Sequence, residues 1–440
     1  MKTYEEYKVS GVKWLGKVPK HWEICRFKDF ISLQTQTSLS ENKIGLENIE
    51  CATGKFIETN SEFEGNGIAF DVGDVIYGKL RPYLKKVWLS TFNGNAVGDF
   101  FVFRAKNTNS ASYIRYVMLS DGFTKEADGS TFGTKMPRVS SNFIMSMRYF
   151  LPPPFEQQAI ADYLDAKTEK MDQMIAKAEK KIEYLGELKQ SLITRAVTRG
   201  LNPNAPLKDS GVKWIGDVPE HWEIAPLKYF THIKTGSTPP TLNQEYYESE
   251  DINWFTPGDF ESLTLKKSGK MISNKAKDDY ACKIFPAGSV YIVGIGATIG
   301  KVASCSESAS CNQQINVLIP IKDKIDCRYL VYCMNSQKEG ILLSANMVTL
   351  PIINQTKMGQ LPIPIPLYAE QQQIATYLDI KCSKIDYIIA AQKKKIAYLQ
   401  ELKQSLIANV VTGKIKVNAA RKSKVDDNTA KMQSIKQLGV

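Results

Sequence analysis

Two stretches of the chain, each roughly 40 residues long, carry apolar side chains at intervals of seven residues, with further apolar residues four positions later. The apolar positions of the first stretch are Leu164, Met171, Ile175, Ile182, Leu185 and Leu192. Those of the second stretch are Leu378, Ile385, Ile389, Ile396, Leu399 and Leu406. Such a seam is typical of coiled-coil helices, so the pattern predicts two long helices, over 155–198 and 367–411.

Prolines precede both predicted helices, in "LPPPFEQQ" from 151 and in "LPIPIPLYAEQQ" from 361, and proline disfavours helix in the residue before it. Each helix would be about 60 Å long at ~1.5 Å per residue. Polar residues interrupt the seams at Thr168, Lys189, Gln392 and Lys403. A helix with one apolar face is not stable alone in water, so we expect the two seams to pack on each other. The alternative is that each helix packs only on its own globular domain.

The regions between these helices have a different pattern. Residues 30–150 and 230–360 are rich in Val, Ile, Phe, Tyr and Gly, and "DVGDVIYG" (71–78) and "PAGSVYIVG" (286–294) read as strands entered by turns. "SYIRYVMLS" (112–120) and "RYLVYCMNS" (328–336) read as short helices in matching places. Both middles are therefore predicted to share one α+β fold.

The chain is an internal duplication. "SGVKWLGKVPKHWEI" (10–24) returns as "SGVKWIGDVPEHWEI" (210–224) with 12 of 15 positions identical, and "YLGELKQSLI" (from 184) returns as "YLQELKQSLI" (from 398) with nine of ten. The sequences between these shared segments have largely diverged. We predict globular domains at 1–154 and 210–366, the two helices given above, a linker at 199–209 and a basic, mobile tail at 412–440.

Composition narrows the class of protein. The 440 residues are 43% hydrophobic and carry a net charge of +11, which makes a polyanion such as nucleic acid a plausible partner and a solvated basic surface the alternative. No apolar run has the length of a membrane span, and "MKTYEEYK" has no apolar core of a secretion signal. Eight cysteines in a chain of this length fit a reducing cytoplasm better than a disulfide scaffold.

Several motifs do not support catalysis. "GVKWLGK" (11–17) has the spacing of a phosphate-binding loop but is followed by Val18 in place of the magnesium-binding Ser or Thr. "GIGATIGK" (294–301) is read as a glycine turn. Cys305, Cys311, Cys327 and Cys333 form pairs with five residues between partners, wider than structural zinc sites prefer. With no nucleophile, base and orienting residue in sight, we expect a non-catalytic protein with no metal site.

Basic residues interleaved with aromatics, and a run of amides, are the candidates for DNA contact. They occur in "YGKLRPYLKKVW" (77–88), in "GTKMPR" (133–138) and around the glycine turn of the second middle. Arg and Lys suit phosphates and guanine edges, and Asn and Gln suit adenine. Any single one of them could instead be a solvated surface residue. The candidate DNA-binding residues are Lys79, Arg81, Lys85, Lys86, Lys135, Arg138, Lys301, Asn312 and Gln313.

The repeated "SGVKWxGxVPxHWEI", "EQQxIAxYLD" and "ELKQSLI" segments together resemble the specificity subunits of type I restriction–modification systems, from Ser10 to about Lys414. The resemblance implies two target-recognition domains separated by two long antiparallel coiled-coil helices with a pseudo-twofold duplication. It also implies reading of a bipartite, asymmetric site in double-stranded DNA, in the cytoplasm of a bacterium or archaeon. Trp14, Trp22, Trp214 and Trp222 would anchor the repeated opening stretch.

The resemblance implies partners as well. Two methyltransferase subunits would dock on the helices, and motor–nuclease subunits would join the full complex. This chain would hold no cofactor, and S-adenosylmethionine would bind to the methyltransferase subunits. The alternative functions are a coiled-coil adaptor that binds only proteins, and a single-chain DNA methyltransferase, for which no cofactor loop is visible.

Overall fold

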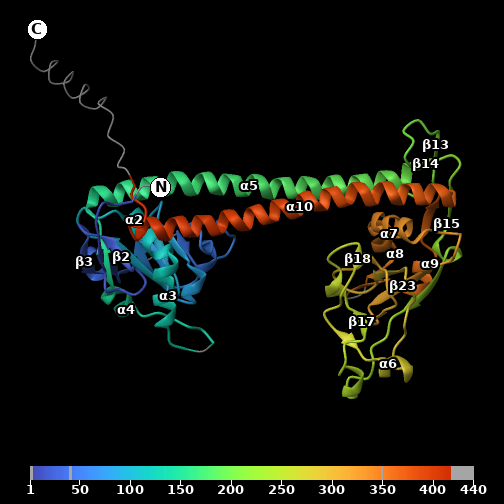
Figure 1. The fold of residues 1–440 in the computed structure, drawn as a ribbon, viewed down its shortest axis with the longest axis horizontal. Helices are drawn as coiled ribbons and strands as arrows, with labels where there is room; N and C mark the ends of the chain where they lie inside the picture. Colours follow the sequence, from blue (N-terminus) through green and yellow to red (C-terminus); the bar gives the residue numbers. More distant parts are fainter. Residues whose placement is uncertain (1–2, 39–41, 134, 348–349, 418–440) are drawn as a thin grey trace, which may run out of the picture. The chain divides into compact units, whose positions relative to one another are not determined.

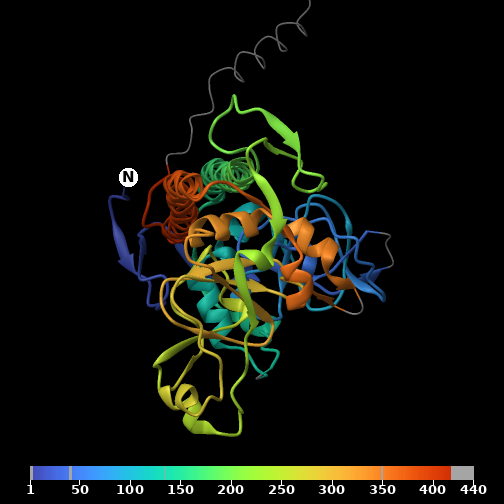
Figure 2. The ribbon, with the colours of Figure 1, turned by 90° about the vertical axis from the view of Figure 1, so that its right-hand side faces the viewer.

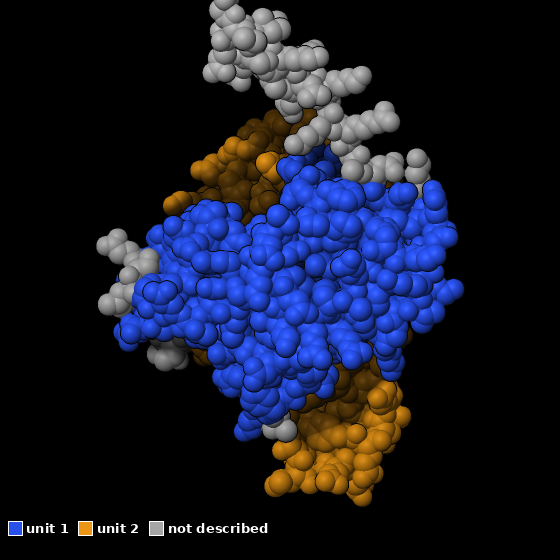
Figure 3. Space-filling view, turned by 90° about the vertical axis from the view of Figure 1, so that its left-hand side faces the viewer, with its two compact units in different colours: residues 1–178, 394–440 blue, residues 179–393 orange. Residues whose placement is uncertain are grey.

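The computed structural model describes residues 3–38, 42–133, 135–347 and 350–417, and the chain forms two compact units. Unit 1 consists of 1–178 and 394–440, and unit 2 of 179–393 (Figure 3). Each unit therefore combines one globular domain with segments of both long helices. The mobile tail was predicted from residue 412, but Thr412 is buried and Ile415 and Val417 pack against the core of unit 1. From residue 418 onward, the predicted tail lies outside the described residues.

The two long helices are α5, Pro154–Arg199, and α10, Tyr368–Val411 (Figure 1). Each helix has an acidic residue in its first turn, Glu156 in α5 and Glu370 in α10. Its negative charge stabilises the helix, because the N-terminal end of the helix dipole is positive. Gly200 and Gly413 follow the helices with φ of +70° and +73°, the left-handed conformation that commonly ends a helix.

In each unit the segments of α5 and α10 run antiparallel and lie side by side (Figures 1 and 2). None of the twelve seam residues is exposed, and five are buried: Leu164, Leu378, Ile385, Leu399 and Leu406. The two lysines that were expected to interrupt the seams each form an ion pair with an aspartate of the other long helix. Lys403 Nζ lies 2.8 Å from Asp172 Oδ1 in unit 1, and Lys189 Nζ lies 2.7 Å from Asp386 Oδ2 in unit 2.

The globular domain of unit 1 contains two four-stranded sheets. The first, in the order β4 (Ile31–Gln34), β11 (Phe100–Ala105), β8 (Val75–Gly78) and β9 (Val87–Leu89), is antiparallel throughout. The second is β5 (Thr37–Ser38), β7 (Gly67–Phe70), β10 (Gly94–Ala96) and β6 (Lys43–Ile44). The helices are α1 (Phe27–Phe30), α2 (Ala111–Leu119), α3 (Asp121–Gly129) and α4 (Ser141–Ser146). Two further strand pairs are β1 (Tyr7–Val9) with β2 (Lys17–Pro19), and β3 (Glu23–Arg26) with β12 (Arg148–Leu151).

Unit 2 repeats this plan with a longer central sheet, in the order β16 (Thr231–Thr235), β23 (Ile315–Pro320), β20 (Ser289–Val293), β21 (Val302–Cys305) and β18 (Thr264–Leu265). The other strands are β13 (Leu207–Asp209) with β14 (Asp217–Pro219), β15 (Glu223–Pro226) with β26 (Pro362–Ile365), β24 (Asn346–Met347) with β25 (Pro351–Ile352), and the sheet of β19 (Met271–Ile272), β17 (Ile252–Phe255) and β22 (Ser310–Cys311). The short helices are α6 (Asn274–Asp278), α7 (Cys327–Ser336), α8 (Lys338–Ser344) and α9 (Gln355–Gly359).

The repeated opening stretch is bonded to the start of the long helix in each unit. In unit 1, Glu156 accepts a hydrogen bond from Trp22 Nε1 at 3.3 Å and lies 2.8 Å from His21 Nε2. In unit 2 the corresponding distances are 3.1 and 3.0 Å, for Trp222, His221 and Glu370. Trp22 and Trp222 are fully buried, so their predicted role as apolar anchors is confirmed.

Each domain core also contains the end of the long helix from the other repeat. The core of unit 1 includes Leu406, Ile407, Val410 and Val411 of α10, together with Trp22. The core of unit 2 includes Ile193, Ala196 and Val197 of α5, together with Trp222. The α+β fold with its long helices and internal duplication is confirmed, and the duplicated halves exchange their helix ends. Among the described residues, no helix is long and apolar enough to cross a membrane.

Candidate nucleic-acid interface

Three backbone hydrogen bonds join two loops of unit 1 to the end of strand β8. Lys79 N donates to Asp99 O at 2.9 Å, Val139 N donates to Lys79 O at 3.1 Å, and Arg81 N donates to Pro137 O at 2.8 Å. We call residues 79–81, 99 and 137–139 the unit 1 clamp. The clamp brings together three of the predicted DNA-binding residues: Lys79 and Arg81 from the segment after β8, and Arg138 from the loop before α4.

Unit 2 makes the same three bonds at the end of strand β20. Gly294 N donates to Gln314 O at 2.8 Å, Ile353 N to Gly294 O at 2.9 Å, and Gly296 N to Pro351 O at 3.1 Å. We call residues 294–296, 314 and 351–353 the unit 2 clamp. The bonds establish the equivalent pairs Lys79 and Gly294, Arg81 and Gly296, Asp99 and Gln314, and Arg138 and Ile352.

Charged side chains dominate the unit 1 clamp. Asp99 accepts hydrogen bonds from Arg138 Nε at 3.1 Å and Nη2 at 2.9 Å, and Lys79 Nζ lies 3.6 Å from its Oδ1. The bonds from Arg138 hold the pKa of the Asp99 carboxyl below its ordinary value. Lys79 Nζ also lies 5.7 Å from the centre of the Phe101 ring. The three charged groups leave one net positive charge on a fixed surface.

Arg81 has a backbone conformation that costs free energy. Its φ is +51°, whereas Gly296 occupies the equivalent position with φ of +98°. The left-handed region costs a residue with a side chain roughly 1–2 kcal/mol, and glycine adopts it readily. The Arg81 side chain is exposed and forms no ion pair with any described residue. Backbone strain combined with a free guanidinium points to a role for Arg81 outside the fold.

Lys135 lies in the loop that joins α3 and α4, which projects from the face of the domain opposite the long helices (Figure 1). Its side chain is exposed. On the same loop, the large apolar side chains of Phe132 and Met136 are 61% and 52% exposed. The loop therefore offers both charge and apolar surface to a partner.

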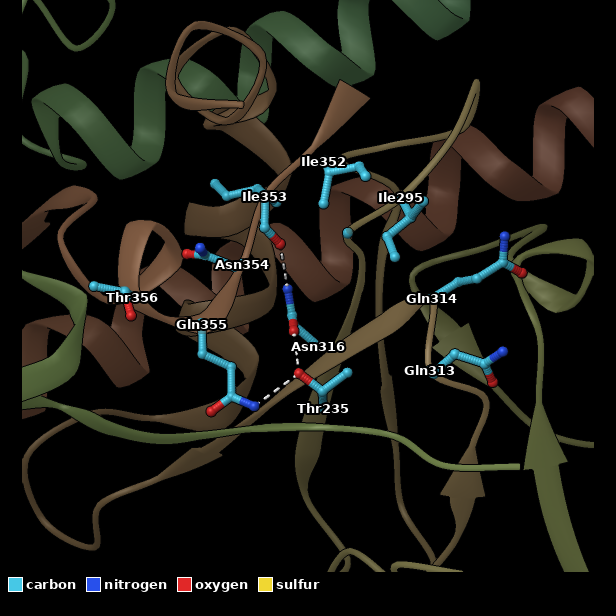
Figure 4. A pocket seen from close by; sticks show the side chains of 11 residues that line it. Thr235, Ile295, Gln313, Gln314, Asn316, Ile352, Ile353, Asn354, Gln355 and Thr356 are labelled. Carbon is cyan, nitrogen blue, oxygen red and sulfur yellow. Dashed lines mark hydrogen bonds between the residues drawn. The ribbon is translucent and has the colours of Figure 1, made fainter. Parts of the chain in front are cut away.

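The unit 2 clamp lines a pocket of about 380 Å³, and most of the other residues that line this pocket carry amides (Figure 4). Asn316 Nδ2 donates to Ile353 O at 2.9 Å, and its Oδ1 accepts from Thr235 Oγ1 at 2.8 Å. A Cβ on Gly294 would lie only 2.7 Å from Asn316 Nδ2, so the glycine makes room for this amide. Gln355 lies 2.8 Å from the Thr235 hydroxyl and is exposed at the rim of the pocket.

Gln313 lines this pocket, whereas its neighbour Asn312 does not, and the two residues differ in exposure. Asn312 is 9% exposed, and its side chain bonds to Gln314 both as donor to Oε1 at 2.9 Å and as acceptor from the backbone N–H at 3.1 Å. Asn312 therefore shapes the turn that presents Gln314. Gln313 is exposed, and its Oε1 accepts a hydrogen bond from Thr238 Oγ1.

Lys86 and Lys301 occupy equivalent positions and have internal partners. Lys86 O accepts from Gly78 N at 2.8 Å, and Lys301 O accepts from Val293 N at 2.9 Å. Lys86 Nζ donates to Ile49 O at 2.9 Å and to Leu46 O at 2.5 Å. Lys301 Nζ donates to Phe260 O at 3.2 Å. These ammonium groups hold turns of their own domains, so we do not include them in the proposed DNA surface.

Lys85 is also bonded within unit 1. Its Nζ forms an ion pair with Asp121 and donates to Gln404 Oε1 at 2.9 Å, and its side chain is only 11% exposed. Lys85 therefore ties the globular domain to the last turns of α10. Since its charge is neutralised there, it too is left out of the proposed DNA surface.

Asp99, Asn316, Gln355 and Thr235 were not among the sequence candidates for this surface. Asp99 precedes the apolar strand "FFVF", where an acidic residue is usually read as part of a turn. The other three lie on or after strands that pair only through long-range contacts, with Thr235 opposite Asn316. A pairing between residues 81 residues apart leaves no pattern in the sequence around either of them.

No candidate metal site accompanies the clamps within the described residues. They contain no group of three His, Cys, Asp or Glu side chains that could hold a metal ion. The four cysteines weighed as zinc ligands, Cys305, Cys311, Cys327 and Cys333, are free thiols, and three of them lie buried in the cores. Burial raises the pKa of the Cys333 thiol to about 12, which keeps it protonated.

Comparison with known proteins finds similarity to one group of proteins, both in a family model and in whole-length relatives. Residues 219–401 match the type I restriction modification DNA specificity domain. The chain is 24% identical, over 95% of its length and 98% of the relative, to the MjaVIII specificity subunit of Methanocaldococcus jannaschii. It is 23% identical to the EcoDI specificity subunit of Escherichia coli, over 91% of this chain and 90% of the relative.

Two solved structures have a similar fold. A chain from a structure titled as the basis of complex assembly and conformational transition of the type I R-M system has a TM-score of 0.71, with 20% identity, over 90% of this chain and 99% of that one. The HsdS subunit of Thermoanaerobacter tengcongensis has a TM-score of 0.52, also with 20% identity, over 90% of this chain and 98% of that one.

Proposed function

The chain belongs to the family of type I restriction–modification DNA specificity subunits, and from that premise we propose that it reads its DNA target in two different halves, one with each globular domain. It is a recognition component and not the catalyst of the complex in which it works. Double-stranded DNA is its ligand, and methyltransferase and motor–nuclease subunits are its partners.

The two clamps are the observation that supports a bipartite site. They share three backbone hydrogen bonds at equivalent residues, yet the first carries charged groups and the second lines a pocket rich in amides. Arg and Lys donors suit guanine and phosphates, whereas Asn and Gln suit adenine. Two domains with one backbone frame and different side chains would select different half-sites, so the whole target would be asymmetric.

Mapping of methylated sites tests this proposal directly. The full chain would be expressed with its methyltransferase partner in a host that lacks other modification systems, and the methylated sequences would be mapped across the host DNA. We expect one asymmetric motif with a gap of unspecified bases. A continuous motif, or a palindromic one from the full chain, would overturn the proposal.

We further propose that two methyltransferase subunits dock on the long helices and that these subunits, not this chain, bind S-adenosylmethionine. The helices carry matching exposed aromatics, since Tyr184 is 55% and Tyr398 is 63% exposed at equivalent positions of the duplication. An exposed tyrosine on a rigid helix is a common interface anchor. Two copies of one anchor suit two copies of one partner.

The mass of the complex tests this stoichiometry. Native mass spectrometry should find two methyltransferase subunits per chain, one after either Tyr184→Arg or Tyr398→Arg, and none after both. Exposed Tyr387, which is 78% exposed but has Gln173 at the equivalent position, serves as the control. Unchanged stoichiometry in the double variant would exclude these tyrosines as the docking sites.

The adaptor alternative makes a different prediction. A protein-only adaptor would bind duplex DNA weakly and without sequence preference, whereas phosphate contacts give a binding constant that falls steeply with salt. Salt-dependent, sequence-selective binding by the assembled complex therefore decides between the two functions.

A further inference from the structure

We propose that Arg138, oriented by Asp99, reads the guanine of a G·C base pair in the half-site of unit 1. This inference rests on the proposed DNA-recognition function and assigns one base pair to two named side chains. Arg138 would contact the base, and Asp99 would be a positioning residue.

The backbone around Arg138 is fixed on both sides. Arg138 N and O exchange hydrogen bonds of 3.1 Å with Phe132, and its neighbours Pro137 and Val139 are held by the clamp bonds to Arg81 and Lys79. The side chain emerges from this fixed frame and is 38% exposed. A reader of base identity needs such a frame, because the difference between bases lies in the positions of a few donors and acceptors.

Asp99 fixes the guanidinium plane itself. The carboxylate accepts from Nε and Nη2, which are two of the five N–H donors of an arginine. No other described residue binds this guanidinium, so the edge that carries Nη1 remains free. A free edge of fixed orientation matches the O6 and N7 acceptors of guanine, the commonest specific partner of arginine in the major groove.

Asp99 also argues against a phosphate as the partner of Arg138. A carboxylate within hydrogen-bonding distance of the guanidinium repels a phosphate and offsets the positive charge that would attract one. Beside base edges the same carboxylate is useful, because it can accept a hydrogen bond from the N4 amino group of cytosine. The two side chains together thus suit a G·C pair. Exposed and unpaired Arg81 has the properties expected of a phosphate contact.

Unit 2 provides an internal comparison. Ile352 and Gln314 occupy the positions of Arg138 and Asp99, as the equivalent backbone bonds show. Ile352 has no donor for guanine, so this kind of guanine reading belongs to unit 1 alone. The inference therefore concerns a base pair in one half of the target only.

Selection from a pool of randomised duplexes tests the inference, with the full chain assembled with its methyltransferase partner. The unaltered complex should select a bipartite motif. Arg138→Lys should select the same motif with one G·C pair of one half-site degenerate, and a duplex changed at that pair should be discriminated on the order of 10- to 100-fold less. Lysine keeps the charge but loses the planar fork, so a phosphate contact would survive this change.

Asp99→Asn separates positioning from a purely structural role. Removal of the negative charge should strengthen binding to all duplexes, while discrimination at the same G·C pair falls. A fall in both, with a lower melting temperature, would show that Asp99 only supports the fold and would overturn its assigned role. A motif unchanged in Arg138→Lys would overturn the guanine assignment and leave the proposed function intact. Failure of the unaltered complex to select any motif would instead refute the proposed function.

Discussion

Arg81 combines strain and exposure at the scale of a single residue, and this combination allows its two effects to be separated. Arg81→Gly relieves a left-handed strain of roughly 1–2 kcal/mol, partly offset by the greater freedom of glycine in the unfolded chain. Arg81→Ala keeps the strain. We expect the glycine variant to be the more stable of the two and at least as stable as the unaltered chain. Thermal unfolding of the three proteins measures this order.

Both Arg81 variants should lose one phosphate contact. The slope of log binding constant against log salt concentration should fall by roughly 0.9 in each, as for one ion-paired phosphate. Lys79→Ala should lower the slope in the same way, although part of its charge is already directed at Asp99. Slopes that stay unchanged in both Arg81 variants would show that the strained arginine serves some contact other than DNA.

Lys86 and Lys301 should behave as structural residues despite their basic character. Lys86→Met leaves Ile49 O without its donor, which we expect to cost about 1–3 kcal/mol of stability. Lys301→Met removes one bond of an exposed side chain, to Phe260 O, and should cost less. The salt slope of DNA binding should not change. Calorimetry measures the stability of each variant, and salt titration of the same preparations measures the slope of DNA binding. A lower slope without a loss of stability would show that these lysines contact DNA.

These lysines also show where prediction from sequence stops at the residue scale. Composition and turn signals indicated correctly that basic residues cluster near 79–86, but they could not separate Arg81, which is free, from Lys86, which binds backbone carbonyls. Those partners, Leu46 and Ile49, are about 40 residues away along the chain. Asp99 escaped notice for the same reason, since its importance depends on Arg138, 39 residues later.

At the scale of elements, the long helices were the most predictable part of the fold. Their seven-residue pattern and the prolines before them placed both ends within one residue of those observed. The short strands were less predictable, because several contain only two or three residues and form through long-range pairing. Lys189 and Lys403 were predicted only as interruptions of the apolar seams, and the structure shows an ion pair at each.

The two ion pairs form a matched experiment, because they are the same pair in two copies of the duplication. Asp172 and Lys403 are 19% and 7% exposed, whereas Lys189 and Asp386 are 22% and 55% exposed. Loss of one partner from a fully buried pair costs roughly 3–5 kcal/mol, and an exposed pair contributes at most about 1 kcal/mol. Because Asp172 keeps Lys55 as a second partner, the loss of Lys403 should fall between these limits. We therefore expect Lys403→Met to destabilise the chain much more than Lys189→Met.

Double-variant cycles measure the coupling within each pair. Asp172→Asn combined with Lys403→Met should recover part of the loss caused by Lys403→Met, because the double variant no longer holds a largely buried carboxylate whose sole partner is the exposed Lys55. The cycle on Lys189 and Asp386 should show a coupling close to zero. Equal couplings at both sites would mean that burial does not control the strength of these pairs. Lys55, whose Nζ lies 3.0 Å from Asp172, must be kept unchanged in every variant.

At the scale of the whole molecule, the exchange of helix ends predicts that residues 1–200 can act as a dimer in place of the full chain. This fragment lacks the end of α10 that completes the core of unit 1. It carries instead Leu192, Ile193, Ala196 and Val197, which lie at the positions of Leu406, Ile407, Val410 and Val411. Gln190 and Lys189 similarly match Gln404 and Lys403. A second copy can therefore supply every missing element, and the pair would be an isologous dimer.

Both recognition domains of such a dimer would be identical, so the DNA read should become a palindrome whose halves match one half of the parent target. Activity should depend on fragment concentration, because the helix ends are now supplied by a second molecule. Ala196 is smaller than the Val410 that it replaces in the core of unit 1, which leaves a small cavity. Ala196→Val should consequently lower the concentration needed for half-maximal methylation, whereas the same change in the full chain would crowd the core of unit 2. Mapping of methylated sites and sedimentation of both fragments test this, and an asymmetric motif or an active monomer would contradict the exchange of helix ends.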